Sequence, residues 1–509
     1  MITVTTLRAA SIIERTPVRA RPPIPQGPFL VAGLGRAGTA ALRALRREFP
    51  SATIHAWDHD TTKEMHRLAR RLEMDGIHTV LGAPPSLDRI LRGGLVVKSP
   101  GVAFASPVIA EAQALEIPVL DELEIGWRLS RAPVLAVTGT NGKSTVSGLA
   151  TAVLAAAGAR VQLAGNTDFG EPLSTAARAP LDWLVCEVSS FQLEGSPEFL
   201  PEVAVFTNLT VEHLGRHRTL ERYGAVKRRL FVRCDSPVAR AVIDVDDAFG
   251  RRLADEIELL GATVSRVGFS ADAEYRVKEA EWDLRRCTLR LATPQGSLRL
   301  TTALPGSYNA RNIAAALGIA GALEVPQDVA TGAVCAFRGP PGRFEHIDEG
   351  QPFSVIVDFA HSPDGIEQLL RSLRAGMTPG AKLRVVFGIG SRAGSAMREM
   401  GRLTRALADH LILTTSGFRG CPPLLALHSS LRGARRASGA ELEIVLDRRR
   451  AIERALSAAG PDDVVAIPGR GAYGEMQPDP RGRAIAFDDR VVARELLRDQ
   501  GVARAARAL

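Results

Sequence analysis

The sequence predicts an α/β protein with parallel sheets, divided into three domains. Short apolar runs alternate with stretches of helical character from Phe29 almost to the C-terminus, as in parallel strands joined by crossover helices. The length of 509 residues provides for about two to four domains, each with its own core. Residues 274–303 depart from this pattern: apolar and polar residues alternate there, so we expect antiparallel strands within or beside the central domain.

The first domain is expected at residues 29–131. Its first strand, FLVAG, includes Gly33, which with Gly35 and Gly38 matches the spacing G-x-G-x-x-G before a helix. Asp58 ends the next strand, 20 residues after Gly38. These features are the fingerprint of a Rossmann-like nucleotide-binding domain, in which glycines let the backbone approach a diphosphate.

The central domain is expected at residues 132–338 and carries the most informative motif. An apolar run, Val134–Val137, leads into a glycine-rich loop that opens a helix. Such a P-loop binds nucleotide phosphates through backbone N–H groups, a lysine and the helix N-terminus, while a hydroxyl holds Mg²⁺. Val137 occupies the place of the first glycine in G-x-x-x-x-G-K-[ST], so the loop is a variant. Its residues are Gly139, Thr140, Asn141, Gly142, Lys143, Ser144 and Thr145.

The remaining segments complete the expected organisation. Residues 1–28 form a tail and Pro-rich linker, and further central strands are expected at 183–187 and 203–208. After a hinge at 338–343, the last domain spans 339–509 and is Rossmann-like. Its strands are VIVDF, LRVVFG, HLILTT, LEIVLD and DVVAIPG.

The composition narrows the class of function. The formal net charge is +8, but arginine is scattered through every segment, which favours anionic small substrates over nucleic acid. Neither a membrane-spanning apolar stretch nor a signal-peptide core is present, so we expect a cytoplasmic protein that does not bind membranes. The five cysteines are far apart in the sequence, which argues against a disulfide framework and a zinc site.

Four segments of the central domain resemble the Mur ligase family, in the family's order. One of these segments, NLTVEHLGRH, departs from the family pattern, because Glu212 and Gly215 replace the two aspartates of that pattern. The segments are TGTNGKST, which is similar to the ATP loop; CEVSSFQL, similar to E-x-S-S-F-Q-L; NLTVEHLGRH, similar to N-x-x-x-D-H-L-D-x-H; and YGAVKRRLF, similar to Y-x-x-x-K-x-R-[IL]-[FY]. The resemblance implies an ATP-dependent ligase.

The resemblance also implies two Mg²⁺ ions. Ser144 or Thr145, Glu187 and His213 would lie beside these metals. Lys227 stands 14 residues after His213, at a position that is carbamylated by CO₂ in many family members. A carbamate would turn this cation into an anionic ligand.

For the adenosine part of ATP, the resemblance implies residues further along the chain. Asn309 and Asn312 match the amides of the family's H-N-x-x-N, although Tyr308 replaces its histidine. Arg343 matches an arginine that contacts the ribose or the phosphates. Asp358, in VDFAHSP, matches a ribose-binding strand end.

The first domain resembles that of the D-glutamate-adding subgroup, which binds the UDP of its sugar substrate. Ser99, Pro100 and Gly101 match the turn that helps to hold the uridine nucleotide, and we assign Asn166 to the same site as the glycine loop and Asp58. NAD is the alternative ligand, but an NAD-dependent oxidoreductase would leave the ATP loop without a purpose.

The resemblance changes along the chain. Up to Lys227 the sequence is similar to the D-glutamate-adding ligases, and from Pro341 onward it is similar to the ligases that add the third peptide residue. Neither amino-acid pocket is intact: D-S-K-A-T and S-F-D-x-F are absent, Ser416–Arg419 replaces D-N-P-R, and Gly469–Tyr473 replaces G-K-G-H-E.

We assign Arg419 and His361 to the incoming amino acid, with Arg392 and Arg470 nearby, because a guanidinium can bind a carboxylate through two charge-assisted hydrogen bonds. The leading hypothesis is a monomeric enzyme of peptidoglycan precursor synthesis. It would join an amino acid, glutamate in the first instance, to a UDP-N-acetylmuramoyl-L-alanine-type carboxylate through an acyl phosphate. The alternatives are a specialised ligase with another amino acid or acceptor, and a nucleotide-binding protein that has lost catalysis.

Overall fold

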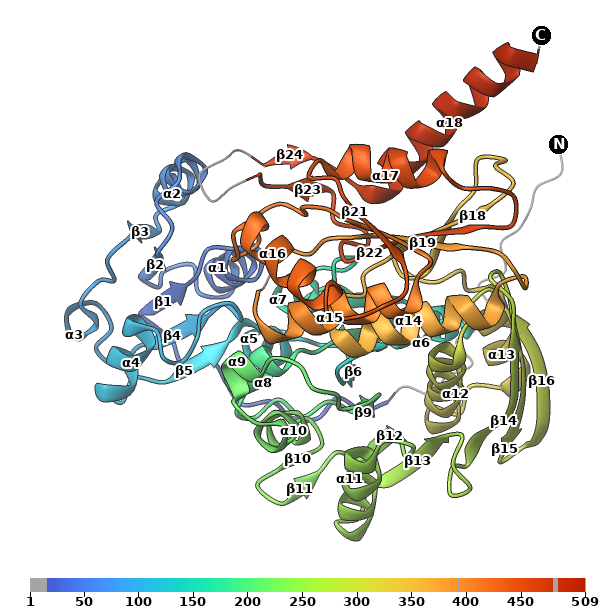
Figure 1. Ribbon diagram of the computed structural model, residues 1–509. Coiled ribbons are helices and arrows are strands. Elements are labelled where there is room, and N and C mark those ends of the chain that lie inside the picture. Colours follow the sequence, from blue (N-terminus) through green and yellow to red (C-terminus); the bar gives the residue numbers. More distant parts are fainter. Residues whose placement is uncertain (1–15, 391–392, 479–483, 509) are drawn as a thin grey trace, which may run out of the picture. The chain divides into compact units, whose positions relative to one another are not determined.

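The computed structural model describes residues 16–390, 393–478 and 484–508. It divides into two compact units, each built on parallel sheets (Figure 1). The first unit holds the described chain up to Leu209 together with His213–Arg276 and Ala314–Ala333; the second holds Thr210–Glu212, Val277–Ile313 and the described chain from Val334. The predicted α/β class is confirmed. Within the described ranges, no helix combines the length and the apolar character that crossing a bilayer requires.

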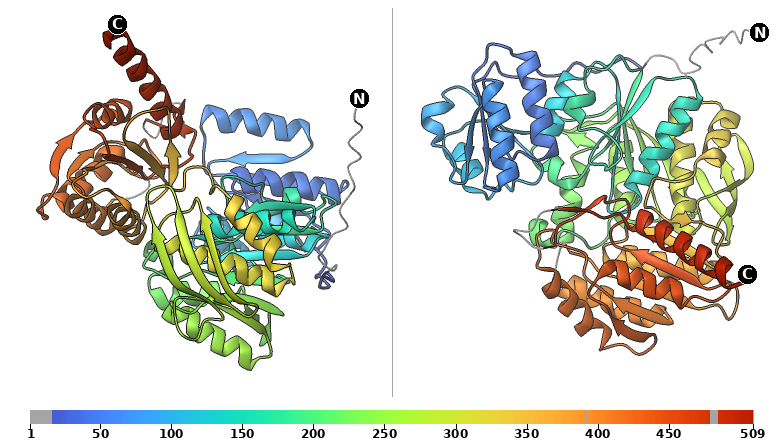
Figure 2. Two further views of the ribbon diagram at one scale, coloured as in Figure 1. Left: turned by 90° about the vertical axis from the view of Figure 1, so that its right-hand side faces the viewer. Right: turned by 90° about the horizontal axis from the view of Figure 1, so that it is seen from above.

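The first sheet is parallel throughout and is covered on both faces. Its elements are β1 (Phe29–Ala32), α1 (Arg36–Glu48), β2 (Ile54–Asp58), α2 (Lys63–Met74), β3 (His78–Leu81), α3 (Leu87–Ile90), β4 (Leu95–Lys98), α4 (Pro107–Ala114), β5 (Val119–Asp121) and α5 (Glu122–Leu129). The strand order is β3-β2-β1-β4-β5. Val31 belongs to a buried cluster with Leu42 of α1, and Leu30 to another with Ile109 of α4. Alternate residues of β1 therefore face helices on opposite sides (Figure 2).

The second sheet has the glycine-rich loop at its centre. Its strands in the first unit and the helices around them are β6 (Val134–Thr138), α6 (Lys143–Ala156), β7 (Val161–Gly165), α7 (Leu173–Ala176), β8 (Trp183–Glu187), α8 (Ser190–Glu194), β9 (Val203–Phe206), α9 (Leu214–His217), α10 (Leu220–Arg228), β12 (Arg240–Asp244), α11 (Ala248–Leu259) and β13 (Thr263–Gly268). A separate antiparallel pair is formed by β10 (Val232–Arg233) and β11 (Ser236–Pro237). The parallel strands lie in the order β13-β12-β9-β6-β8-β7, so β6 has a neighbour on each side. The strand expected at 203–208 ends at Phe206, and the side chains of Thr207 and Asn208 bind the loop.

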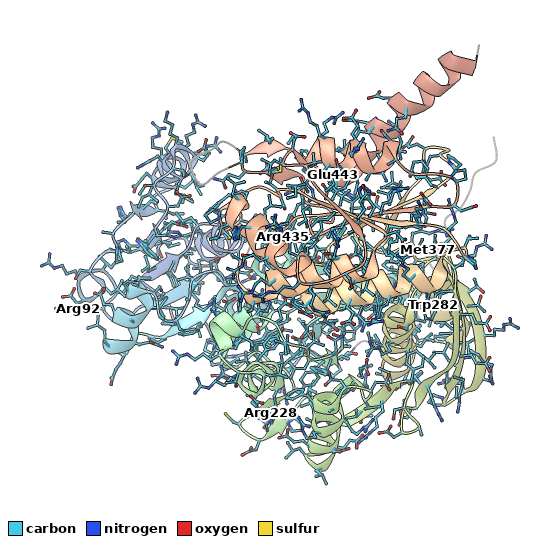
Figure 3. All side chains as sticks on the ribbon, viewed as in Figure 1. Arg92, Arg228, Trp282, Met377, Arg435 and Glu443 are labelled. Atoms are coloured by element: carbon cyan, nitrogen blue, oxygen red, sulfur yellow. The ribbon has the colours of Figure 1, made fainter. Side chains whose placement is uncertain are left out.

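The region expected to hold antiparallel strands contains β14 (Tyr275–Trp282), β15 (Cys287–Thr293) and β16 (Gly296–Thr302), followed by α12 (Ser307–Ala322) and α13 (Gln327–Ala336). The prediction is confirmed for β15 and β16, which pair antiparallel. The start of β14 instead pairs parallel with β13. In the second unit, the indole Nε1 of Trp282 (Figure 3) donates to the Ser372 carbonyl at 3.2 Å.

The third sheet, in the second unit, is also covered on both faces. Its strands and the helices around them are β17 (Glu345–Ile347), β18 (Ser354–Asp358), α14 (Pro363–Gly376), β19 (Leu383–Phe387), α15 (Ser395–Leu407), β20 (His410–Leu413), α16 (Pro423–Ala434), β21 (Glu441–Ile444), α17 (Arg448–Ser457), β22 (Val464–Pro468) and α18 (Asp489–Ala508). A separate antiparallel pair is formed by β23 (Glu475–Met476) and β24 (Ile485–Ala486). The order is β17-β18-β22-β19-β20-β21, with only β17 antiparallel to its neighbour among these strands. Val385 packs in a cluster with α14 and α15, whereas Val386 packs with α17 and α18.

Candidate functional site

The glycine-rich loop joins the buried strand β6 to helix α6. Gly142 immediately precedes the helix with a φ of 82°, a left-handed conformation that glycine adopts without strain. Gly139 has a φ of 149°, and a Cβ atom placed there would lie 1.9 Å from Thr207 Oγ1. Both glycines are therefore required by the path of the backbone, which leaves the N–H groups at the start of α6 for an anion.

Two residues at the end of β9 hold this loop in place. Asn141 N–H donates to Asn208 Oδ1 at 2.9 Å, and Asn208 Nδ2 donates back to the Asn141 carbonyl at 3.1 Å. Thr207 Oγ1 donates to the same carbonyl at 2.7 Å. Sequence reasoning did not assign Thr207 or Asn208 to the site. The available signal was the position of Asn208 at the head of the NLTVEHLGRH segment.

The side chains expected at the first metal converge in the structure. Ser144 Oγ donates to Glu187 Oε2 at 2.8 Å, and both residues are buried at neighbouring strand and helix ends. Thr145 is also buried beside Ser144. A carboxylate and a hydroxyl at this separation are hard oxygen ligands that suit Mg²⁺. Lys143, half-buried at the first turn of α6, donates from Nζ to the Thr140 carbonyl at 2.7 Å.

Lys227 lies against the same loop. Its side chain is 1% exposed, and Nζ donates to the Gly139 carbonyl at 2.6 Å. The ammonium lies 4.4 Å from the centre of the Tyr223 ring, whose centre is 6.0 Å from that of His213. Lys227 and His213 are therefore gathered around Tyr223. Among the described residues, no group of three or more His, Cys, Asp and Glu side chains is arranged to hold a metal.

A chain of polar contacts lies beside this loop region. His217 Nε2 is 2.8 Å from Ser190 Oγ, and His217 Nδ1 is 3.5 Å from Glu194 Oε1. Burial lowers the pKa of His217, which favours the neutral ring. Arg216 donates to Glu194 at 2.8 Å and to the Pro100 carbonyl at 3.3 Å. Within the first unit, the segment after His213 is thus linked to the Ser99–Gly101 turn.

The glycine loop of the first sheet is stabilised from within. Gly33 has a φ of 89°, and a Cβ at Gly38 would lie 1.7 Å from the Gly33 carbonyl oxygen. Asp58 is 6% exposed and accepts the Leu34 N–H through Oδ2 at 2.6 Å. Its carboxylate therefore holds the loop closed. Gly35 has open space around its Cα.

The Ser99–Gly101 turn lies directly beside this loop. Ser99 N–H donates to the Ala32 carbonyl at 2.8 Å, and a Cβ at Gly33 would lie 2.9 Å from Ser99 Cβ. Pro100 and Gly101 follow at the same sheet edge. Asn166 is exposed. Its backbone N–H donates at 2.7 Å to the carbonyl of Glu187, the residue whose side chain accepts the Ser144 hydroxyl.

The residues expected to bind adenosine lie in the second unit. Asn312 Nδ2 donates to Asn309 Oδ1 at 3.0 Å, and Asn309 Nδ2 donates to the Pro305 carbonyl at 2.8 Å. The Asp358 carboxylate accepts the N–H groups of Phe344 and Ala360 at 2.7 and 2.6 Å. Burial raises the pKa of Asp358.

Arg343 and the two expected amino-acid residues surround aromatic rings in the same unit. The Arg343 guanidinium lies 4.2 Å from the Phe359 ring centre, and the His361 ring centre lies 4.5 Å from it. Arg419 is exposed and stacks on Tyr473.

The expectation that Arg470 is available to a carboxylate is wrong. Arg470 is 1% exposed, and its guanidinium donates to the backbone carbonyls of Ser416 and Glu475 at 2.9 and 2.8 Å. Arg392 lies outside the described residues.

The predicted residues therefore fall into groups. One unit brings together the ATP loop, Glu187, His213 and Lys227, and also contains the glycine loop with its neighbouring turn. The other unit contains Asn309 and Asn312, and the stack around Phe359 with Arg343, Asp358, His361 and Arg419.

Comparison with known proteins gives two family matches. Residues 137–320 match "Mur ligase middle domain", and residues 342–471 match "Mur ligase, glutamate ligase domain". The chain is 35% identical over 393 residues to the UDP-N-acetylmuramoyl-L-alanyl-D-glutamate–2,6-diaminopimelate ligase of Thermosynechococcus vestitus, an alignment covering 72% of this chain and 77% of that protein.

A second relative has a different acceptor and amino acid in its name. The chain is 33% identical over 351 residues to the UDP-N-acetylmuramoylalanine–D-glutamate ligase of Prochlorococcus marinus, covering 65% of this chain and 72% of that protein. Among solved structures, the UDP-N-acetylmuramate–alanine ligase of Thermotoga maritima superposes with a TM-score of 0.58 at 21% identity, covering 93% of this chain and 99% of that one. This last similarity supports the fold alone.

Proposed function

The chain belongs to the Mur ligase family of ATP-dependent, ADP-forming acid–amino-acid ligases, and from this premise we propose its substrates and the roles of its residues. It joins glutamate to the carboxylate of a UDP-N-acetylmuramoyl-L-alanine-type acceptor in peptidoglycan precursor synthesis. The observation that carries the proposal is the convergence of Lys143, Ser144, Glu187 and Lys227 on one loop.

The reaction has two steps. The acceptor carboxylate attacks the γ-phosphorus of ATP, which yields an acyl phosphate and ADP. The amine then attacks the acyl carbon, and inorganic phosphate leaves from the tetrahedral intermediate. Little covalent chemistry is required of the protein, so positioning and charge neutralisation account for most of the catalysis.

The ATP loop supplies the positioning. Lys143 reorients from the Thr140 carbonyl to the terminal phosphates, and Ser144 with Glu187 provides oxygen ligands for Mg²⁺. Bound Mg²⁺ neutralises charge on the phosphates. The clamp formed by Thr207 and Asn208 keeps the loop backbone ready for the nucleotide, so little ordering is needed on binding.

Lys227 would provide an anionic metal ligand after its neutral amine adds CO₂ and the resulting carbamic acid releases a proton to solvent. Its burial beside Tyr223 and its 2.6 Å contact with the Gly139 carbonyl hold the amine at the ATP loop, where a carbamate oxygen could reach a metal. His213, whose ring centre lies 6.0 Å from that of Tyr223, is the neighbouring residue that we assign to the same metal.

The remaining sites receive the acceptor, ATP and the amine. The Gly33–Gly38 loop and the Ser99–Gly101 turn, adjacent at one sheet edge, bind the UDP diphosphate, with Asp58 bracing the loop and Asn166 reaching the sugar. In the second unit, Asn309, Asn312, Arg343 and Asp358 bind adenosine, and Arg419 and His361 bind the amino acid. The enzyme acts as a cytoplasmic monomer.

The test is inorganic phosphate release with UDP-N-acetylmuramoyl-L-alanine and a panel of amino acids. Glutamate should give the fastest release, and Lys143→Ala should reduce it by about a thousandfold, roughly 4 kcal/mol of transition-state stabilisation. Lys63→Ala, at the start of α2, is the matched control and should retain full activity. Release with another acceptor or amine alone would establish a specialised ligase. ATP binding without release under any condition would establish a protein that has lost catalysis.

A further inference from the structure

Four side chains of the second unit form a continuous stack. The Arg343 guanidinium covers Phe359 at 4.2 Å, and the Phe359 and Tyr473 ring centres are 5.2 Å apart at an interplanar angle of 57°. The Arg419 guanidinium lies 3.6 Å from the centre of the Tyr473 ring. A cation over an aromatic face at such distances is attracted by the ring quadrupole. The guanidinium carbon of Arg419 therefore lies over the face of the Tyr473 ring.

The backbone of the loops that carry Arg419 and Tyr473 is held in place by Arg470. The buried Arg470 guanidinium donates to the carbonyls of Ser416, Glu475 and Phe487 at 2.9, 2.8 and 3.1 Å. One side chain thus ties the loop that leads to Arg419 to the loop that carries Tyr473. The N–H of Arg419 itself donates to the Gly390 carbonyl at 3.0 Å.

The exposed end of the stack, at Arg419, is positively charged, whereas carboxylates lie at its other end: Asp358 is near Arg343, and Glu212 Oε1 is 3.3 Å from His361 Nε2. Arg419 is exposed and makes no ion pair with any residue that the structure describes, whereas the buried Asp489 is paired with Arg448 at 2.7 Å. The pKa of Arg470 is lowered to about 10 by its burial and then by the charge of Arg448, and it still remains protonated at neutral pH. An approaching carboxylate therefore meets attraction, and an approaching ammonium meets like charge.

We propose that Tyr473 is a specificity-determining residue that presents Arg419 to the side-chain carboxylate of the incoming amino acid. The ring occupies one face of the guanidinium, so its N–H edge remains for a two-pronged contact with a planar carboxylate. The enzyme therefore selects an acidic amino acid over a diamino acid. This inference rests on the proposed function, because it takes Arg419 to be part of the amino-acid site.

The test compares three variants of the full chain by phosphate release with glutamate, aspartate, lysine and diaminopimelate. Tyr473→Phe keeps the stack and should leave the KM for glutamate within twofold of the parent. Tyr473→Leu removes it and should raise that KM at least tenfold, with the KM for ATP unchanged. Tyr473→Glu gives Arg419 an ionic partner and should lower the preference for glutamate over diaminopimelate by at least a hundredfold.

Two results would overturn the assignment: a parent enzyme that prefers diaminopimelate, or a Tyr473→Leu variant whose KM for glutamate equals that of the parent. Calorimetric titration of the parent and of Tyr473→Leu with each amino acid separates the inference from the proposed function. If no amine supports phosphate release, the proposed function fails. Weaker glutamate binding by Tyr473→Leu would still support the role of Tyr473, and equal binding would reject it.

Discussion

Buried charged side chains in the first unit are satisfied in different ways. Lys98 and Asp121 are fully buried and form an ion pair at 2.8 Å. Glu122, the next residue, has no such partner: Oε1 accepts the Ser174 N–H at 2.7 Å, and Oε2 has no hydrogen-bond partner among the described residues. Burial raises the pKa of Glu122 to about 7 from 4.5. A buried carboxylate that is not fully paired favours its neutral form.

Glu122 should make the stability of the first unit depend on pH. The pKa of Glu122 is higher in the folded state than in the unfolded state, so the unfolded state releases this proton first. The free energy of unfolding therefore falls as pH rises from about 4.5 to about 7, by about 3 kcal/mol in all. We expect Glu122→Gln to melt at a higher temperature than the parent at pH 8 and to remove this part of the pH dependence. Thermal unfolding between pH 5 and 8 measures it. The exposed Glu64→Gln should behave like the parent, and an unchanged pH profile for Glu122→Gln would refute the shift.

Lys227 should act as a carbamate. Lys227→Ala should lose phosphate release, and added acetate or another short carboxylate should partly restore it, because the small anion can occupy the volume that the side chain leaves. The assay is phosphate release against acetate concentration, with chloride at equal ionic strength as control. A variant as active as the parent would assign Lys227 a structural role only. An inactive, well-folded variant without rescue would argue against an anionic ligand.

At the scale of elements, the ATP loop depends on the end of β9. The strand stops at Phe206. Thr207 N–H still donates to the Thr138 carbonyl of β6 at 3.1 Å, but the side chains of Thr207 and Asn208 bind the loop backbone. The loop is thereby braced by a segment far from it in sequence.

We therefore expect Gly139→Ala to abolish nucleotide binding, because the added Cβ would collide with Thr207 Oγ1 and the residue has a φ of 149°. Gly332→Ala, in α13, is the matched control, since nothing lies within 4 Å of its Cβ position. Calorimetry with a non-hydrolysable ATP analogue measures both. Unchanged affinity in Gly139→Ala would show that the loop does not form the nucleotide site.

The segment before β1 also braces the first unit. The Arg21 side chain is 5% exposed and donates to the carbonyls of Trp127 and Ala132 at 2.7 and 2.9 Å. It also lies 3.6 Å from Glu202. These contacts tie the segment to the connection between α5 and β6.

Arg21→Met should destabilise the first unit by about 2 kcal/mol, because the Trp127 and Ala132 carbonyls lose a buried donor and Glu202 loses its cation while keeping the Val134 N–H at 2.6 Å. Urea unfolding followed by tryptophan fluorescence would report it, since Trp127 lies beside the guanidinium. The exposed Arg131→Met is the control. Equal midpoints for the two variants would show that the contacts of Arg21 contribute little.

At the scale of the whole molecule, the two glycine-rich loops should bind different nucleotides. We expect calorimetry to detect UDP and UDP-N-acetylmuramoyl-L-alanine but not NAD. Gly38→Ala should weaken UDP binding and preserve ATP-analogue binding, because its Cβ would lie 1.7 Å from the Gly33 carbonyl oxygen, in the first sheet. Tight NAD binding with no response to UDP would reverse the assignment of this domain.

The sequence by itself determined the features that are local in the chain. Residues 134–145 fold as predicted, because an apolar run, two glycines and a helix-forming segment dictate strand, turn and helix with little help from elsewhere. The same reasoning predicted β8 and the β15–β16 hairpin. Family membership followed from short motifs of this kind. Three features were not predicted: where β9 ends, the parallel pairing of β14, and the inward orientation of Arg470.

Only the tertiary structure decided what the distant residues do. Asn208 reaches a loop 67 residues away, and Arg470 binds a carbonyl 54 residues away. Asp58 braces the glycine loop, while Tyr473 meets Arg419 face to ring. A sequence motif gives the identity of a side chain. The orientation of that side chain depends on the backbone groups and rings that surround it after folding. The contrast is clearest between two arginines: the Arg470 guanidinium is 1% exposed and held by three backbone carbonyls, whereas Arg419 is exposed.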